Sequence, residues 1–453
     1  MIKLNQYYRL LILIIFIATF DSSSLLAQDR TSGTHPNIVL LFVDDWGWAD
    51  VGYRNDRFET PNIDQMKRDG LEFTRAYVPT PTCSPSRASL LTGKEAIRLE
   101  MPRHIEHSNK DGSNDDKYNY WKNDPAQMPS INWLPLEEET YAEVLKEQGY
   151  YNMFIGKWHL GHEPYYPIHQ GFDEMFGTGN WGHPKSYYPE FFKDDLLSEY
   201  TEDYLTDILT DKAVDFVNNY KQENPFMLTF WYYNVHSPFV GRKDLVDHFL
   251  AKGYELKEAT YAAMVASVDE SVGRVRDALK QNGLDENTVV LLISDQGGFY
   301  SNAPLSGAKT GGNTLGEGGA RVPFYVYYPG LTTPGSVSDT PIQITDVFPT
   351  LAEIASNRPY KSDQIQGESL MPALKGNQLN TRDLFFYRSY EDQYAAIISG
   401  NWKLIKYRSG KFELFNVVED ISEKQNRIGE DLAIEKELKI KLEKWETEAV
   451  PNY

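Results

Sequence analysis

Three apolar runs along the chain have the pattern of strands buried on both faces. Residues 37–43, 226–233 and 288–294 are almost uninterrupted apolar sequences, without the alternation typical of a strand that has one solvent-facing side. Segments with the period of a helix lie between them, at residues 140–148, 204–220 and 261–282. This alternation of strands and helices predicts an α/β fold with a large, mostly parallel sheet flanked by helices.

Polar side chains follow the carboxyl ends of these predicted strands. Asp44 and Asp45 come directly after the first run, His236 follows the second, and Asp295 and Gln296 follow the third. Ligands of open α/β sheets bind beyond the carboxyl ends of the strands. We therefore expect these side chains to surround one site.

The pattern changes near residue 380. Short strand-like segments occupy residues 383–390, 394–399, 402–407 and 411–417. A charged amphipathic helix is predicted at 432–448, so we expect a smaller α+β subdomain with an antiparallel sheet at 379–453, after a catalytic domain at 28–378. Residues 100–135 show no clear period and are interpreted as a long surface excursion, of the kind that often shapes a binding cleft.

The first 27 residues have the features of a secretory signal peptide. Lys3 and Arg9 come first, an apolar run follows at 10–20, and small residues at 22–27 precede a cleavage site expected after Ala27. A membrane anchor is the alternative, but the run is shorter than the ~20 residues that span a bilayer. No later segment is apolar enough to span a membrane, so we expect an exported protein, periplasmic or secreted, without a membrane span after signal removal.

Net charge argues against one class of ligand, and cysteine content excludes intrachain disulfides. The chain has 45 Lys and Arg residues against 65 Asp and Glu residues, a net charge of −20, which argues against nucleic-acid binding. It contains a single cysteine, Cys83, so no intrachain disulfide can form. A lone cysteine in an exported protein is either a small buried apolar residue or a reactive group.

The residues around Cys83 favour the reactive interpretation. Pro85 suits the first turn of a helix, Gly93 suits its end, and Arg87 falls one turn after Cys83 on the same face. Unpaired N–H groups and the macrodipole favour an anion at a helix start, and an arginine adds a planar fork for its oxygens. The sequence therefore predicts an anion site at Cys83.

This Cys-x-Pro-x-Arg motif with a following Thr-Gly resembles the signature of the formylglycine-dependent sulfatases, the type I sulfatases of the alkaline phosphatase superfamily. Further family elements appear in the same order, at residues 36–39, 60–64, 156–161, 236–238, 317–323 and 346–351. The resemblance implies an alkaline phosphatase-like fold and a sulfuric ester hydrolase. It also implies that Cys83 is oxidised to formylglycine (3-oxoalanine), whose hydrated aldehyde is the nucleophile, by a formylglycine-generating or sulfatase-maturing enzyme.

The resemblance also implies a metal site. By position, Asp44, Asp45, Asp295 and Gln296 hold a calcium ion together with the modified Cys83. All five offer oxygen ligands, which a hard cation selects, and Mg²⁺ remains an alternative because oxygen ligands alone do not separate the two ions. Gln296 departs from the more frequent Asn or His of the family. Asp295 is also the expected acceptor of the proton that the nucleophile loses.

Further catalytic roles follow from the resemblance. Lys157 is expected to contact the sulfate and the nucleophile, and His159 to remove the proton that lets sulfate leave from the covalent intermediate. His236 and Lys309 are expected to protonate or stabilise the leaving oxygen. Arg87 adds to the fixed positive charge that an anionic transition state requires. Because Lys157 and His159 lie two apart in an extended-looking segment, we expect them on one side of the chain. Four other histidines match no family element: His104, His107, His162 and His183.

Two alternatives remain open within this resemblance. Phosphonate and phosphodiester hydrolases share the formylglycine and the metal ligands, so the motif does not exclude them. A non-catalytic, glycan-binding relative should have lost at least one site residue, and here all are present. For the substrate we expect a sulfated polysaccharide or its oligosaccharides, in a bacterial degradation pathway. This expectation rests on export and on tryptophans that can stack on sugar rings, namely Trp46, Trp48, Trp121, Trp133 and Trp181.

Overall fold

The computed structural model describes residues 35–122, 124–125 and 127–451. The predicted signal peptide lies outside the described residues. Residues 36–453 form one compact unit. The proposed boundary between residues 378 and 379 therefore stays a prediction.

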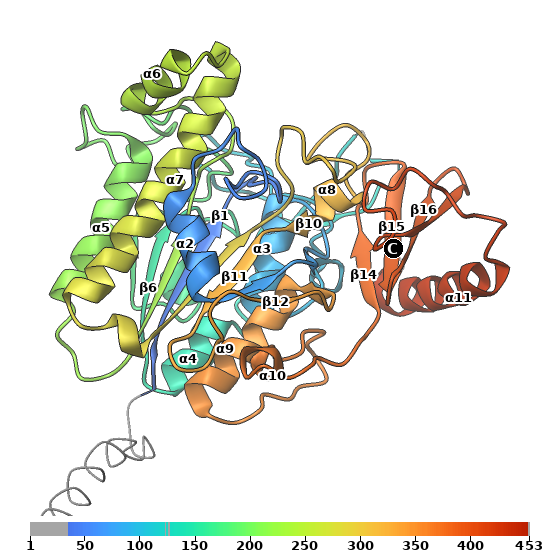
Figure 1. Ribbon diagram of the computed structural model, residues 1–453. Coiled ribbons are helices and arrows are strands. Elements are labelled where there is room, and N and C mark those ends of the chain that lie inside the picture. Colours follow the sequence, from blue (N-terminus) through green and yellow to red (C-terminus); the bar gives the residue numbers. More distant parts are fainter. Residues whose placement is uncertain (1–34, 123, 126, 452–453) are drawn as a thin grey trace, which may run out of the picture. The chain divides into compact units, whose positions relative to one another are not determined.

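An eight-stranded sheet forms the centre of this unit, and β1 lies in its middle (Figure 1). The strand order is β12 (Ser336–Ser338), β2 (Leu71–Phe73), β11 (Phe324–Tyr327), β9 (Thr288–Ser294), β1 (Asn37–Val43), β8 (Phe226–Trp231), β6 (Tyr151–Gly156) and β7 (Glu174–Phe176). The five strands from β9 to β7 are parallel, whereas β11 runs antiparallel to both β9 and β2. The predicted mostly parallel sheet is confirmed.

Helices cover both faces of the sheet because the side chains of each central strand point alternately to either side. Ile38, Leu40 and Phe42 of β1 pack into one core cluster, and Val39 and Leu41 pack into the other. The first core includes residues of α3 (Cys83–Thr92), α4 (Tyr141–Glu147), α9 (Val347–Ser356) and α10 (Met371–Leu374). The second includes residues of α2 (Pro61–Asp69), α5 (Leu205–Asn219), α6 (Lys243–Ala251) and α7 (Leu256–Gln281). Both faces of the sheet are therefore buried, which explains the continuous apolar runs.

The remaining elements of the catalytic region are short. A three-stranded sheet is formed by β10 (Arg321–Val322), β3 (Ala76–Tyr77) and β13 (Ile342–Gln343), next to α8 (Glu317–Ala320). Single 3₁₀ turns occupy Ala96–Leu99, Pro167–His169, Asp285–Asn287 and Ile344–Asp346. The excursion at 100–135 contains a two-stranded ribbon, β4 (Tyr118–Asn119) and β5 (Ser130–Ile131), and a buried ion pair in which Arg103 Nη1 lies 2.6 Å from Asp124 Oδ2.

The C-terminal part has the predicted antiparallel sheet and helix, drawn in red in Figure 1. Its elements are β14 (Leu384–Tyr387), β15 (Gln393–Ser399), β16 (Trp402–Tyr407), β17 (Phe412–Asn416) and α11 (Leu432–Ala449). Leu438, Leu442 and Trp445 of α11 pack against one face of this sheet. The opposite face packs against Tyr77, Leu315 and Ala320 of the catalytic region. No helix in the described part of the chain is long and apolar enough to cross a membrane.

Candidate active site

Cys83 is the first residue of α3, and the preceding turn is held by the C-terminal subdomain. Arg388 donates to the carbonyl of Pro81 and, over 2.9 Å, to Thr82 Oγ1, which also lies 2.9 Å from the Tyr390 hydroxyl. The helix ends at Gly93, whose φ of 71° is in the left-handed region that glycine adopts without strain. The predicted helix is thus confirmed, with the cysteine at its positive end.

Arg87 lies one turn further along α3 and is fully buried. Its Nη2 donates to Asp295 Oδ2 over 3.0 Å, and its Nη1 donates to the carbonyl oxygen of Lys157 over 3.0 Å. The rings of Phe42 and Trp231 lie 5.4 and 5.3 Å from the guanidinium carbon. Burial opposes the charge, but Asp295 and other nearby acidic groups outweigh it and raise the pKa of Arg87. The guanidinium is therefore a fixed cation.

Three buried carboxylates meet where β1 and β9 end. Val43 of β1 pairs with Ser294 of β9, so the residues that follow these two strands emerge side by side. Ligand oxygens of Asp44, Asp45 and Asp295 lie within 4.8 Å of one another. The N–H of Asp45 donates to Asp295 Oδ1 over 2.9 Å. Burial raises the pKa of Asp45 and, together with Asp44, raises that of Asp295 to about 6.

Two lysines complete the charge balance of this cluster. Lys157, which directly follows β6, donates to Asp44. Lys309, in the loop after β9, donates to Asp45 Oδ2 over 2.5 Å, and Asp45 holds the pKa of this lysine above its ordinary value despite burial. With Arg87, three cations thus face three carboxylates.

Gln296 links the carboxylates to the cysteine. Its Nε2 donates to Asp45 Oδ1 over 2.8 Å and to Cys83 Sγ over 3.3 Å. Exchanging the nitrogen and oxygen of this amide presents an oxygen to the same neighbours. The donor set of three carboxylates and one amide thus fits a hard cation such as Ca²⁺ or Mg²⁺.

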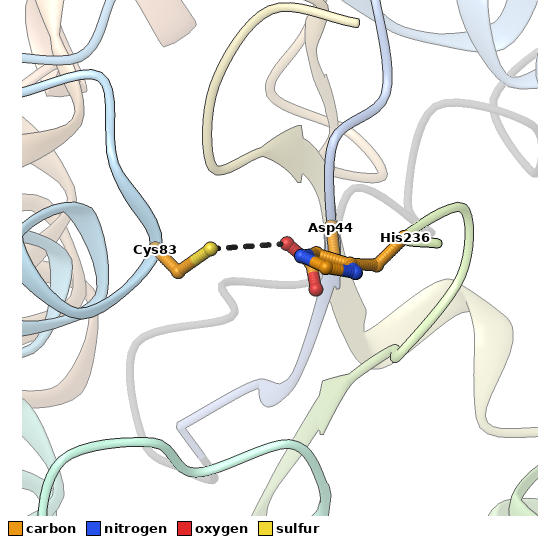
Figure 2. Close-up of side chains that lie close together, drawn as sticks. All are labelled: Asp44, Cys83 and His236. Atoms are coloured by element: carbon orange, nitrogen blue, oxygen red, sulfur yellow. Dashed lines mark hydrogen bonds between the residues drawn. The ribbon is translucent and has the colours of Figure 1, made fainter. Parts of the chain in front are cut away.

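Cys83, at the start of α3, and His236, in the loop after β8, converge on Asp44 (Figure 2). Cys83 Sγ lies 3.8 Å from Asp44 Oδ1, and His236 Nε2 lies 3.7 Å from Asp45 Oδ2. His236 Nδ1 contacts the carbonyl of Ser237 at 2.6 Å, so this nitrogen carries the proton when the ring is neutral. Burial works against ionisation of the thiol, but Lys157, Lys309 and His236 hold the pKa of Cys83 well below its usual range.

His159 reaches the site by a route different from the one expected. The φ of His159 is 54°, so the segment from Lys157 to His159 is not extended. The expectation that an extended segment places Lys157 and His159 on one side of the chain is therefore wrong. The backbone turns here because the strand pairing ends at Lys157, whose N–H donates to Trp231. His159 Nε2 contacts the carbonyl of Ile105 at 3.0 Å, and within the described residues its buried Nδ1 has no hydrogen-bond partner. Burial, reinforced by Lys157, lowers the pKa of His159 well below its usual value.

Some site neighbours carry no signal in the sequence. His183 stacks on His236, with ring centroids 5.3 Å apart and planes at 6°. His107 lies 5.8 Å from His159 between ring centroids, and His104 lies nearby in the same loop. These residues come from irregular loops, where no periodicity predicts which side chain points inward. The fourth unassigned histidine, His162, packs against Trp133 instead.

The tryptophans expected to stack on sugars are mostly used for packing. Trp46 and Trp181 are buried, and Trp133 stacks on Tyr165 with ring centroids 4.7 Å apart. The Arg54 guanidinium covers Trp48 at 3.7 Å. Trp121 is the partly exposed member beside the site, where its ring meets those of His104 at 5.5 Å and Tyr390 at 4.8 Å.

Comparisons with known proteins agree with this geometry. The family model described as sulfatase matches residues 36–357, and the model described as N-sulphoglucosamine sulphohydrolase, C-terminal, matches residues 314–448. The N-acetylgalactosamine-6-sulfatase of Canis lupus familiaris is 32% identical over 392 residues, covering 81% of this chain and 71% of the relative. Arylsulfatase A of Homo sapiens is 30% identical over 413 residues, covering 83% and 74%.

A solved structure extends the similarity to nearly the whole chain. The crystal structure of Ps i-CgsB in complex with k-i-k-neocarrahexaose has a TM-score of 0.77 and 30% sequence identity, covering 91% of this chain and 93% of that one. The region matched by the sulfatase family model, residues 36–357, includes the predicted catalytic and metal-binding residues, from Asp44 to Lys309. On this evidence the chain belongs to the sulfatase family and is a sulfuric ester hydrolase.

Proposed function

We propose that this sulfatase hydrolyses sulfate esters of a sulfated polysaccharide or its oligosaccharides, with a formylglycine made from Cys83 as nucleophile and a bound calcium ion. The observation that carries the proposal is the buried Cys83 at the start of α3, beside three carboxylates whose oxygens lie within 4.8 Å. Three buried acids cannot all remain ionised at such distances without cations. The cluster is therefore suited to a divalent ion next to the nucleophile.

The surroundings of Cys83 fit an oxygen in place of sulfur. Gln296 Nε2 donates to Cys83 Sγ, and the charges of Lys157 and Lys309, together with His236, hold the pKa of the thiol low. When formed and bound, the formylglycine supplies a hydroxyl nucleophile and the calcium ion supplies electrostatic stabilisation of negative charge.

The remaining side chains neutralise the charge of the sulfate or transfer protons. Arg87 and Lys157 bind and neutralise the sulfate oxygens, and Lys309 faces the same centre from the opposite loop. The Nδ1–H of His236 donates to the Ser237 carbonyl. A second proton, on Nε2, is therefore the one that His236 donates to the leaving oxygen. His159 is held neutral by burial, and its unpartnered Nδ1 can accept a proton.

A sulfated carbohydrate is the proposed substrate class. A relative of known structure is 30% identical and is seen in complex with k-i-k-neocarrahexaose, and another relative is named N-acetylgalactosamine-6-sulfatase. Trp121, partly exposed beside His104 and Tyr390, offers an aromatic edge to a sugar ring.

Export and maturation are proposed on the sequence alone. Residues 1–27 have the order of charged, apolar and small residues of a signal peptide, so we infer a periplasmic or secreted protein. Maturation needs a formylglycine-generating or sulfatase-maturing enzyme as partner. Mass analysis of the exported protein tests both points, because it reports the N-terminal residue and the oxidation state of Cys83.

The activity is tested by release of inorganic sulfate from a panel of sulfated oligosaccharides. The protein is co-produced with a formylglycine-generating enzyme, and conversion of Cys83 is verified by mass. We expect release from at least one glycan and none from Cys83→Ala. Faster turnover of a phosphodiester or phosphonate ester than of every sulfate ester would contradict the proposal and favour the phosphorus-ester alternative.

A further inference from the structure

A cleft of about 560 Å³ adjoins His159. It is lined by two loops, residues 104–110 from the excursion after α3 and residues 181–193 from the segment after β7. This volume lies in the range of pockets that hold small organic ligands. None of the catalytic roles assigned above uses the outer part of this cleft.

The outer part of the cleft is basic in a chain that is acidic overall. Lys110, Lys185 and Lys193 line it and are exposed, whereas Glu106 is the one acidic residue among the described lining residues. The whole chain, in contrast, has 45 basic and 65 acidic residues. A concave surface lined by one sign of charge concentrates ligands of the opposite sign. The lining is therefore suited to an anion.

The lysine ammonium groups are available to a ligand. Within the described part of the chain, neither Lys110 nor Lys193 forms an ion pair, and Lys193 Nζ lies 5.6 Å from the centre of the Trp181 ring. Lys185 pairs with Glu190 at 2.7 Å, but the two side chains are 56% and 81% exposed. An ion pair this exposed is weak and exchanges readily for another partner.

The lining of the cleft includes both His159 of the catalytic centre and the three lysines. His159 lies beside His107, with 5.8 Å between the two ring centroids. The ring centroids of His107 and Trp181 are 5.0 Å apart, and Lys193 Nζ lies over the Trp181 ring. A glycan whose scissile sulfate lies at Cys83 and whose chain passes His159 therefore brings its neighbouring sugar to the lysines.

We propose that this cleft binds a second anionic group, on the sugar next to the one that loses its sulfate. The enzyme then prefers glycans with at least two acidic groups over singly sulfated ones. This inference rests on the proposed function and deepens it. A sulfate ester and a uronic carboxylate share the required chemistry, namely anionic oxygens that accept from ammonium groups.

The first test compares substrates that differ by one charge. For the best glycan of the sulfate-release panel, kcat/KM is measured with and without a sulfate, or alternatively a carboxylate, on the neighbouring sugar. We expect the extra anion to raise kcat/KM on the order of tenfold through KM, since exposed pairs each change affinity a few-fold. The variant with Lys110→Gln, Lys185→Gln and Lys193→Gln should lose most of this advantage. The matched control is Lys436→Gln on α11, which should keep it.

The second test needs no turnover. The Cys83→Ala protein is titrated calorimetrically with sulfated dextran oligosaccharides and with unsulfated ones. We expect binding of the sulfated probe alone, weakened about tenfold by the triple substitution and by added salt. Equal binding by the triple variant, or an unchanged advantage of the second anion, overturns the inference. Lysine-dependent binding without sulfate release from any glycan would instead support the cleft and count against the proposed function.

Discussion

Calcium should raise the melting temperature of the protein by about 3 °C, and the acidic cluster should be the cause. A ligand that binds only the folded state stabilises it by about 2.7 kcal/mol at a free concentration 100 times its Kd. The compact unit spans residues 36–453, so its unfolding entropy near the melting temperature is on the order of 0.9 kcal/mol per kelvin. The ratio of these two quantities is a shift of about 3 °C.

The structure explains why the shift should depend on the carboxylates. Asp44, Asp45 and Asp295 are fully buried, and burial raises the pKa of Asp45 and Asp295, so ionisation of these groups is costly without a cation. Lys157 and Lys309 pair with Asp44 and Asp45 and thereby offset part of that cost. A divalent ion bound by these carboxylates would lower that cost further.

Differential scanning fluorimetry measures the shift after treatment with EDTA and addition of CaCl₂, with MgCl₂ as the parallel arm. Asp45→Asn and Asp295→Asn should each abolish the shift, whereas Asp420→Asn, at a half-buried position of the C-terminal subdomain, should retain it. The relevant quantity is the shift of each variant, since the substitutions also change the melting temperature of the metal-free protein. No shift with either ion, or the same shift in Asp45→Asn, would refute the assignment of the metal site.

Three further predictions concern catalysis and stability. Arg87→Lys should lower kcat/KM for sulfate release about 100-fold, because a lysine cannot donate to Asp295 and to the Lys157 carbonyl in the fixed geometry of a guanidinium. Near-wild-type turnover would contradict this. Burial raises the pKa of Asp50 to about 6, so its contribution to stability is present below pH 4 and lost as pH rises through 6. Asp50→Asn should remove up to about 3 kcal/mol of this pH dependence, measured by urea unfolding at pH 4 and pH 7. Lys403 is buried with Glu317 at 3.1 Å, and Lys403→Met should lower the unfolding free energy by about 3–5 kcal/mol; a loss below about 1 kcal/mol speaks against the pair.

Much of the fold follows from short-range pattern. Residues 37–43 and 288–294 are strands with the predicted bounds, because a strand covered on both faces needs apolar residues at every position. The aspartates meet because these two strands are parallel neighbours, so their carboxyl ends lie at one edge of the sheet. Proline in the first turn and a left-handed glycine at the end mark the helix of Cys83 equally clearly.

Other features depend on contacts between residues far apart in the chain. The sequence does not show that His159 adopts a positive φ, or that its ring contacts Ile105. The predicted helix at 261–282 begins earlier, at Leu256, because an exposed first turn has no apolar period to mark it. Trp181 belongs to the core rather than to a sugar platform, which only the packing of the surrounding loops decides.

The most direct test of the account is release of inorganic sulfate by the matured protein, measured by ion chromatography across the sulfated-oligosaccharide panel beside Cys83→Ala made in the same way. We expect sulfate to appear with the protein whose Cys83 is converted to formylglycine and not with Cys83→Ala. Equal release by both proteins would contradict the central claim that Cys83 is the source of the nucleophile.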